Sequence, residues 1–284
     1  ELSSPLVGYE NLMRKDIIFL RGGGLGDFIL TLPLLKAAYQ QGLLVSLYAN
    51  GNYLSLLDKE WNWLLKKDLD ELCGKAPPNS KGSQVVSFWK DSDWKKEMIN
   101  AGASFTTSLN PRPGDGQLFI LQALDEIGWS IPDRVLSEPI LGNHWKGGDQ
   151  VLWIHPGSGG VDKNLPISYF LSRANQWLLS REDRQVVISF GEADEKLFHK
   201  FQLNNLVHNP QVQLFRPSSM LDFRNRMAST ADKFLGNDSG PGHLAANLGI
   251  PVEILFCSTP SAVWSPLGPR VEIYDWDSVS SKIL

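Results

Sequence analysis

The segment at residues 236–244, GNDSGPGHL, has the residue types of an anion-binding site. It follows an apolar run and precedes a helical pattern, so its glycines lie where a strand is followed by a helix N-terminus. Backbone N–H groups and the helix dipole favour a diphosphate at such a point. We therefore expect Ser239, Gly240 and Gly242 to offer N–H groups, and Ser239 also a hydroxyl, to a diphosphate.

Two further side chains of this segment can carry charge. The carboxylate of Asp238 repels phosphate, so we expect it to accept a hydrogen bond from a sugar hydroxyl or to cap the helix. His243 either donates a hydrogen bond to a phosphate or has a structural role in the helix. We count both Asp238 and His243 among the residues predicted to bind the ligand that carries this diphosphate.

A second glycine loop, HPGSGG at residues 155–160, also follows an apolar run. Ser158 adds a hydroxyl to its flexible backbone, and Lys163 supplies a mobile cation just beyond it. The loop predicts that Lys163 neutralises a diphosphate, with a solvated surface lysine as the alternative. Glu192 and Glu195 follow a later apolar run at 185–190, where acidic residues of nucleotide domains bind ribose hydroxyls, and we select Glu195 as the candidate. Otherwise both carboxylates simply favour the first turn of the next helix.

The first glycine loop, RGGGLGD at residues 21–27, matches neither a dinucleotide fingerprint nor a Gly-Lys-Ser/Thr phosphate loop. Its glycines let a ligand approach the backbone closely at a helix start, and we include Gly26 among the residues predicted to bind the diphosphate-containing ligand. Asp27 stands where an apolar run ends and a helical pattern begins. It is either a catalytic carboxylate or a helix cap.

These loops require a scaffold of alternating strands and helices. The alternation predicts an α/β fold of two Rossmann-like domains whose parallel sheets face each other across a cleft. Residues 130–150 are rich in Pro, Gly and polar types, so we expect one domain at 1–145 and another at 146–284. We expect strands at 16–20, 43–48, 84–88, 151–154, 185–190, 212–214, 233–235 and 252–256, and helices at 27–39, 118–129 and 168–180, with about five strands in the second sheet.

Composition excludes several classes of protein. The chain has 284 residues and a formal net charge of −4, so it has no basic field for nucleic acid. Its two cysteines, Cys73 and Cys257, fall in different predicted domains and suggest no disulfide framework. No apolar run approaches the roughly 20 residues of a membrane span, and the N-terminus does not look like a signal sequence. We therefore expect a cytoplasmic protein.

The segment at residues 54–72 places leucines and Trp61 at helical spacing beside three lysines. This pattern is typical of a helix that packs its apolar face on a sheet. A peripheral contact with the inner membrane is the alternative that it leaves open.

Three blocks, in order, resemble glycosyltransferase family 9, the ADP-heptose:lipopolysaccharide heptosyltransferases. They are Gly26-Asp27 with TLPLL at 31–35, HPG at 155–157 with Lys163, and GNDSGP continuing into HLAANLGIPV at 236–252. The resemblance implies a GT-B fold and an inverting transfer without a metal or other cofactor.

The resemblance also implies the partners and the roles of the residues. The donor is ADP-heptose or a related nucleotide-sugar held by the C-terminal domain, and the acceptor is a lipid-linked or oligosaccharide glycan such as the lipopolysaccharide core. Asp27 is the general base. Lys163 and the helix start at 239–243 stabilise the departing ADP.

Two alternatives stay open. A metal-dependent GT-A enzyme needs an Asp-x-Asp motif, which Asp91 and Asp93, or Asp275 and Asp277, provide by letter; the first pair lies in a charged stretch typical of a solvated helix start. The other alternative is a non-catalytic nucleotide-sugar-binding protein with a degenerate acceptor domain. The retained Asp27 argues against it.

Overall fold

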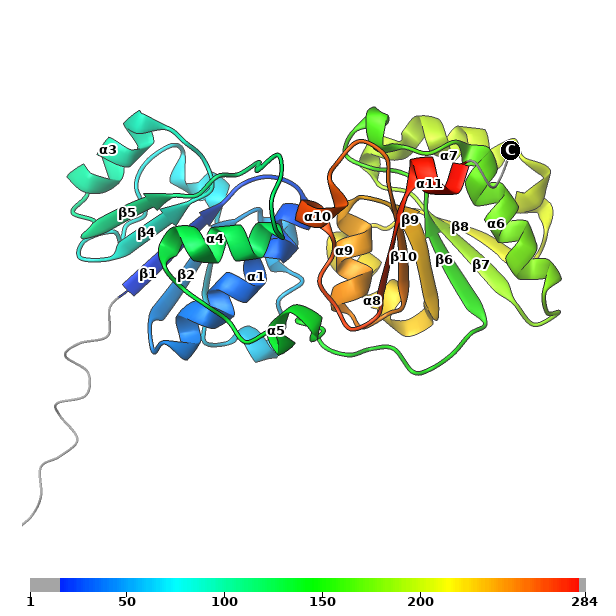
Figure 1. Ribbon diagram of the computed structural model, residues 1–284, viewed down its shortest axis with the longest axis horizontal. Helices are drawn as coiled ribbons and strands as arrows, with labels where there is room; N and C mark the ends of the chain where they lie inside the picture. The colour runs from blue at the N-terminus through cyan, green and yellow to red at the C-terminus, as the bar shows by residue number, and fades with distance from the viewer. Residues whose placement is uncertain (1–15, 281–284) are drawn as a thin grey trace, which may run out of the picture.

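Two parallel β-sheets organise residues 16–280, the part of the chain that the computed structural model describes (Figure 1). The first sheet has the order β3-β2-β1-β4-β5 and the second the order β11-β10-β9-β6-β7-β8. The strands are β1 (Asp16–Arg21), β2 (Leu44–Ala49), β3 (Leu65–Asp68), β4 (Gln84–Ser87), β5 (Phe105–Ser108), β6 (Val151–His155), β7 (Gln185–Ser189), β8 (Val212–Phe215), β9 (Lys233–Asn237), β10 (Val252–Phe256) and β11 (Val271–Asp275).

Helices connect the strands and cover the sheets. In β1, Ile17 and Phe19 belong to one buried cluster and Ile18 and Leu20 to another, as expected for a parallel strand buried on both faces. The α-helices are α1 (Leu25–Gln40), α2 (Gly51–Leu54), α3 (Ser92–Asn100), α4 (Phe119–Ile127), α5 (Arg134–Ser137), α6 (Ile167–Leu179), α7 (Glu195–Gln202), α8 (Met220–Thr230), α9 (Gly240–Asn247), α10 (Ser261–Trp264) and α11 (Trp276–Ser280).

All eight predicted strands are present, within a residue or two of the expected bounds. The helix expected from Asp27 begins two residues earlier, at Leu25, so that Asp27 is its third residue. The expectation of about five strands in the second sheet was wrong, because β11 adds a sixth. β3 and β5 were also missed; they are four-residue edge strands without a buried run.

The helix expected over residues 54–72 is absent. α2 ends at Leu54, short turns follow, and β3 then pairs with β2. Pairing with a neighbouring strand has overridden the helical spacing of the leucines. Leu57, Trp61 and Leu64 are buried in the core, so their apolar surface is not available to a membrane.

The two domains pack through α1 and α9, which lie between the two sheets (Figure 1). Phe119 of α4 stacks on Trp264 of α10, with ring centroids 5.3 Å apart. Asp58 and Arg224 form an ion pair of 2.9 Å across the same interface. The predicted boundary at 145/146 falls in the segment between α5 and β6, which hydrogen-bonds to the end of α9 through Leu141.

The structure does not describe the two ends of the chain. The N-terminal residues on which the signal-sequence expectation rests lie outside the described residues, as do residues 281–284. None of the helices within 16–280 is long and apolar enough to cross a bilayer. Cys73 and Cys257 are free, exposed and in different domains.

Candidate active site between the two domains

The N-termini of α1 and α9 meet at the domain interface. A Cβ atom added to Gly240 would lie 2.6 Å from the Cβ of Leu25 and 3.1 Å from the Gly26 nitrogen. A Cβ added to Gly26 would lie 3.1 Å from Cδ2 of His243. Both glycines are therefore required by close packing. The first and third glycine segments of the sequence, one from each domain, are brought into direct contact.

Two buried polar atoms at the start of α9 find no hydrogen-bond partner among residues 16–280. One is Oγ of Ser239, which precedes the helix but does not cap it. The other is Nδ1 of the buried His243. A buried polar group left unpaired is costly and calls for an explanation such as a ligand. These two atoms, beside a helix N-terminus, suit the oxygens of an anion.

Gly242 has a different role. Its N–H donates to the carbonyl of Ser239, so this amide is engaged within the helix. A Cβ at Gly242 would lie 2.6 Å from Cδ1 of Ile254 in β10. We therefore assign Gly242 to the packing of α9 on its sheet rather than to direct contact with a ligand.

Asp238 holds Lys163 in place. Its Oδ2 accepts hydrogen bonds from Nζ of Lys163, at 2.7 Å, and from Oγ1 of Thr259, at 2.6 Å. Nε2 of His243 lies 3.9 Å from Oδ1. Burial alone raises the pKa of Asp238, but His243, Lys163 and Thr259 outweigh it and lower this pKa to about 2. Asp238 does not cap α9, which corrects one of the two roles expected for it.

Asp27 is held from both sides at the start of α1. Its Oδ2 accepts a hydrogen bond of 2.9 Å from the N–H of Gly24, and its Oδ1 accepts one of 2.9 Å from Nη2 of Arg21. The carboxylate therefore caps the helix and also forms an ion pair. These two functions do not exclude a catalytic role, since each oxygen keeps a further lone pair.

The two ion pairs have opposite exposure. In the first, the side chain of Arg21 is 2% exposed and that of Asp27 is 25% exposed. In the second, the side chain of Asp238 is 6% exposed and that of Lys163 is 34% exposed. The first domain thus presents a carboxylate and the second presents an ammonium group.

Two predicted residues stand apart from this arrangement. Ser158 folds back on its own loop, its hydroxyl donating to the carbonyl of Gly160 at 2.6 Å. Glu195 forms ion pairs with Arg216 and His199. Within residues 16–280, neither makes a hydrogen bond or ion pair with another predicted site residue.

A buried polar group next to these residues was missed from the sequence. Asp194 lies at the carboxyl end of the second sheet, where its Oδ2 accepts from the N–H of Gly191 and lies 3.5 Å from Nε2 of His155. Burial lowers the pKa of His155 to about 4, although Asp194 opposes this, so His155 is neutral at pH 7. A Cβ at Gly157 would collide with the Asp194 carboxylate, so this buried pair fixes the second glycine loop.

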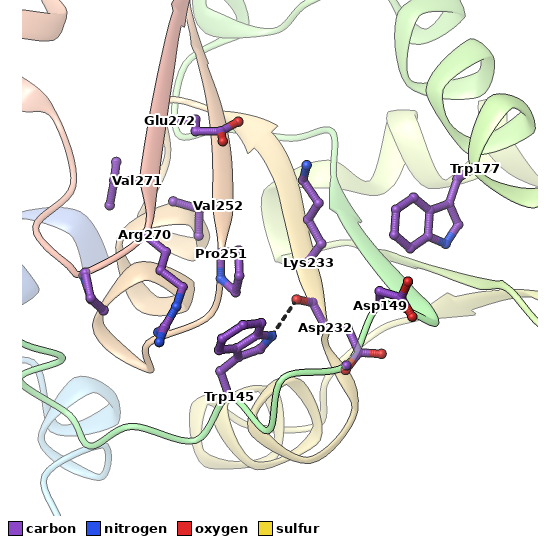
Figure 2. A pocket seen from close by; sticks show the side chains of 12 residues that line it. Trp145, Asp149, Trp177, Asp232, Lys233, Pro251, Val252, Arg270, Val271 and Glu272 are labelled. Atoms are coloured by element: carbon purple, nitrogen blue, oxygen red, sulfur yellow. Dashed lines mark hydrogen bonds between the residues drawn. The ribbon is translucent and has the colours of Figure 1, made fainter. Parts of the chain in front are cut away.

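A separate pocket lies at the opposite, amino-terminal edge of the second sheet (Figure 2). It encloses about 340 Å³ and is lined by Trp145, Trp177 and the first residues of β9, β10 and β11. Two of its polar groups are already engaged. Nε1 of Trp145 donates to the carbonyl of Asp232 (Figure 2). Lys233 pairs with Glu253. It is not the predicted donor site.

The Asp-x-Asp segments do not gather metal ligands. Oδ1 of Asp91 caps α3 by accepting from the N–H groups of Asp93 and Trp94. Over residues 16–280, no group of three His, Cys, Asp or Glu side chains is placed to hold a metal ion.

Several solved structures share this architecture. E. coli ADP-heptose lps heptosyltransferase II is 16% identical, with a TM-score of 0.66 over 92% of this chain and 90% of that one. E. coli heptosyltransferase WaaC with ADP is 13% identical, with a TM-score of 0.66 over 94% of this chain and 98% of that one. The iron-containing dodecameric glycosyltransferase TibC from enterotoxigenic E. coli H10407 is 16% identical, with a TM-score of 0.57 over 91% of this chain and 64% of that one.

These similarities establish the GT-B fold, with two parallel-sheet α/β domains. No curated protein sequence matches the chain. The family model for glycosyltransferase family 9 (heptosyltransferase) matches residues 128–281, more than half of the chain, and this range contains the start of α9, Asp238 and Lys163. The chain therefore belongs to glycosyltransferase family 9, and the protein is a glycosyltransferase.

Proposed function

We propose that the protein transfers a heptose, or a related sugar, from an ADP-sugar to a lipopolysaccharide-core or other glycan acceptor, with inversion and without a metal. The observation that carries the proposal is the opposite exposure of the two ion pairs at the contact between α1 and α9. Asp27 directly follows Gly26, and Asp238 lies two residues before Gly240, so the glycine contact brings the two pairs to one place.

The second domain supplies the donor side of this reaction. The unpaired hydroxyl of Ser239, the N-terminus of α9 and the ammonium of Lys163 receive the diphosphate of the donor. Nδ1 of His243, which has no hydrogen-bond partner within residues 16–280, is available for a further contact. As the bond between the anomeric carbon and ADP breaks, these groups stabilise the growing negative charge on ADP.

The first domain supplies the acceptor side. Asp27 takes the proton from an acceptor hydroxyl while that oxygen attacks the anomeric carbon from the face opposite ADP. One bond forms as the other breaks, the electron pair leaves with ADP, and the configuration at the anomeric carbon inverts. Arg21 and Gly24 hold the carboxylate during this transfer.

The donor class is supported by the structural relatives, one of which is described with ADP-2-deoxy-2-fluoro heptose bound. We propose a lipid-linked or oligosaccharide acceptor and a cytoplasmic protein, in keeping with two separate free cysteines. A contact with the inner membrane then requires a surface other than residues 54–72, because the apolar side chains there are largely buried.

Thermal shift with nucleotides tests the donor class. We expect ADP to raise the Tm more than UDP, GDP or NAD, because the sequence blocks resemble those of ADP-sugar users and the first glycine loop is not a dinucleotide fingerprint. A ligand at a hundred times its Kd adds about 2.7 kcal/mol of stability. A larger shift with UDP would contradict the donor assignment.

A turnover assay tests the chemistry. We expect ADP release from ADP-heptose in the presence of a lipopolysaccharide-core acceptor, unchanged by EDTA. TibC is described as iron-containing, so loss of activity in EDTA and recovery with a metal would overturn metal independence. Nucleotide binding without any turnover would favour the non-catalytic alternative.

A further inference from the structure

Arg21 is a buried cation whose position needs an explanation. It ends β1, and its guanidinium lies over the ring of Phe88, 4.2 Å from the centroid, and 5.3 Å from that of Phe119. Burying a charge is costly unless hydrogen bonds and an opposite charge compensate. Burial lowers the pKa of Arg21 to about 10, with Asp27 opposing the change, so the group stays charged at pH 7.

Within the part of the chain that the structure describes, the side-chain hydrogen bonds of Arg21 are directed at one residue. Nε donates to the main-chain carbonyl of Asp27 at 3.0 Å, while Nη2 donates to its Oδ1 at 2.9 Å. The planar guanidinium thus binds the backbone and the side chain of Asp27 together, which fixes the orientation of the carboxylate relative to α1. A lysine has no such fork and could make only point contacts.

One of the two rings that contact Arg21 also packs on a residue of the other domain. Phe119, which contacts the guanidinium, stacks on Trp264 of α10 at an interplanar angle of 19°. Trp264 follows Thr259 in the chain, and Thr259 is hydrogen-bonded to Asp238 in the donor half of the site. The second domain therefore supports the position of Arg21 indirectly, through the ring of Phe119.

We propose that Arg21 is a positioning residue, which holds the Asp27 carboxylate in the orientation that accepts the proton of the acceptor. This inference rests on the proposed role of Asp27 as the general base. Arg21 acts through Asp27, since its side chain is buried and its hydrogen bonds go to that residue. Its removal should therefore slow the chemical step and leave the binding of the donor unchanged.

A double-mutant cycle tests this inference. Arg21→Met and Arg21→Lys are each made in the wild-type protein and in Asp27→Asn, and kcat and KM for ADP-heptose are measured with a lipopolysaccharide-core acceptor. We expect Arg21→Met to lower kcat by about 10- to 100-fold, the range for a misplaced catalytic group, with KM within about twofold. Arg21→Lys, which keeps the charge, should fall between Met and wild type. In Asp27→Asn, neither substitution should lower kcat further.

Arg184→Met is the matched control. Arg184 also lies over an aromatic ring, that of Trp177 at 3.7 Å, and also pairs with an aspartate, but it lies outside the site. The Arg184→Met substitution should therefore leave kcat unchanged. If Arg21→Met does not fold, Arg21→Lys alone decides, because kcat equal to wild type in this variant would overturn the need for the guanidinium fork.

Two other outcomes separate the possible failures. If Arg21 substitutions lower kcat by the same factor with and without Asp27, Arg21 acts independently and the inference is wrong. If Asp27→Asn itself keeps full activity, the proposed general base is wrong, whatever Arg21 does.

Discussion

The ion pair of the first domain and the ion pair of the second use the same kinds of group in opposite ways. In Arg21–Asp27 the cation is buried and the carboxylate reaches the surface, whereas in Lys163–Asp238 the carboxylate is buried and the cation reaches the surface. In each pair the buried partner fixes the exposed one. The more exposed partner is the one that a substrate can meet, so we propose that one domain supplies the base and the other supplies a group that binds the diphosphate.

The two pairs also differ in how the chain builds them. Arg21 and Asp27 are six residues apart, on the two sides of the loop that joins β1 to α1. Lys163 and Asp238 are 75 residues apart and meet because β6 and β9 are neighbours in the sheet. The first pair is a local device, and the second depends on the complete fold of its domain.

Substitution of the exposed carboxylate should have the largest effect. Asp27→Asn removes the proposed general base, so turnover should fall by roughly 10²-fold or more. The amide oxygen can still accept from Gly24, which preserves the cap of α1. Steady-state kinetics with ADP-heptose and a lipopolysaccharide-core acceptor measures the loss.

Asp91→Asn is the matched control for this substitution. Asp91 also caps a helix, but with a single oxygen, so asparagine can replace it there and turnover should be unchanged. Asp27→Asn and Asp91→Asn with equal activity would show that Asp27 is only a cap, and the contrast between the two pairs would lose its meaning.

Substitution of the exposed cation should have the next largest effect. Lys163→Ala removes the charge that we propose stabilises the departing ADP, so we expect a loss of about 3 kcal/mol of transition-state stabilisation, or roughly 10²-fold in kcat. Lys200→Ala, which removes an exposed lysine of α7, is the control and should be silent. A Lys163→Ala enzyme as fast as wild type would make Lys163 an ordinary surface lysine.

Substitution of the buried carboxylate, Asp238, should lower the free energy of unfolding and not only the rate. The pKa of Asp238 is lowered to about 2 in the folded protein from an ordinary 3.8, so its stabilising effect is complete above pH 4 and lost as the pH falls toward 2. Asp238→Asn should therefore lower the free energy of unfolding at pH 7 by on the order of 2 kcal/mol, and by less at pH 3. Urea unfolding at the two pH values measures this difference.

Asp149→Asn controls for the loss of any aspartate. Asp149 is paired with Arg181 but exposed, so its replacement should change the free energy of unfolding little at either pH. An Asp238→Asn deficit that is the same at pH 7 and pH 3 would mean that the ionised carboxylate is not what stabilises the site.

The sequence predicts the glycine segments of this site because each is a local pattern of strand, loop and helix start. β3 and β5 escape such reasoning, since LKKD and FTTS carry no buried run and become strands only by pairing at the edges of the sheet. A helix was wrongly expected over residues 54–72, because the helical spacing of its leucines gives no sign that β3 pairs with β2.

The predicted site residues divide along the same line. Asp27, Lys163 and the start of α9 were predicted because they lie in or beside glycine loops. Arg21 and Thr259 were missed, because each has a role only through a partner that the local sequence does not specify. The opposite exposure of the two ion pairs is likewise a property of the folded chain.

Titration calorimetry with ADP tests most directly whether the two exposed groups serve opposite halves of the reaction. ADP is titrated into the wild-type protein, Asp27→Asn and Lys163→Ala. We predict that Asp27→Asn binds ADP within about twofold of wild type, whereas Lys163→Ala binds it about tenfold more weakly, as expected for one partly exposed charge-assisted hydrogen bond. Equal weakening by both substitutions, or none by Lys163→Ala, would contradict the assignment of a base to the first domain and a diphosphate ligand to the second.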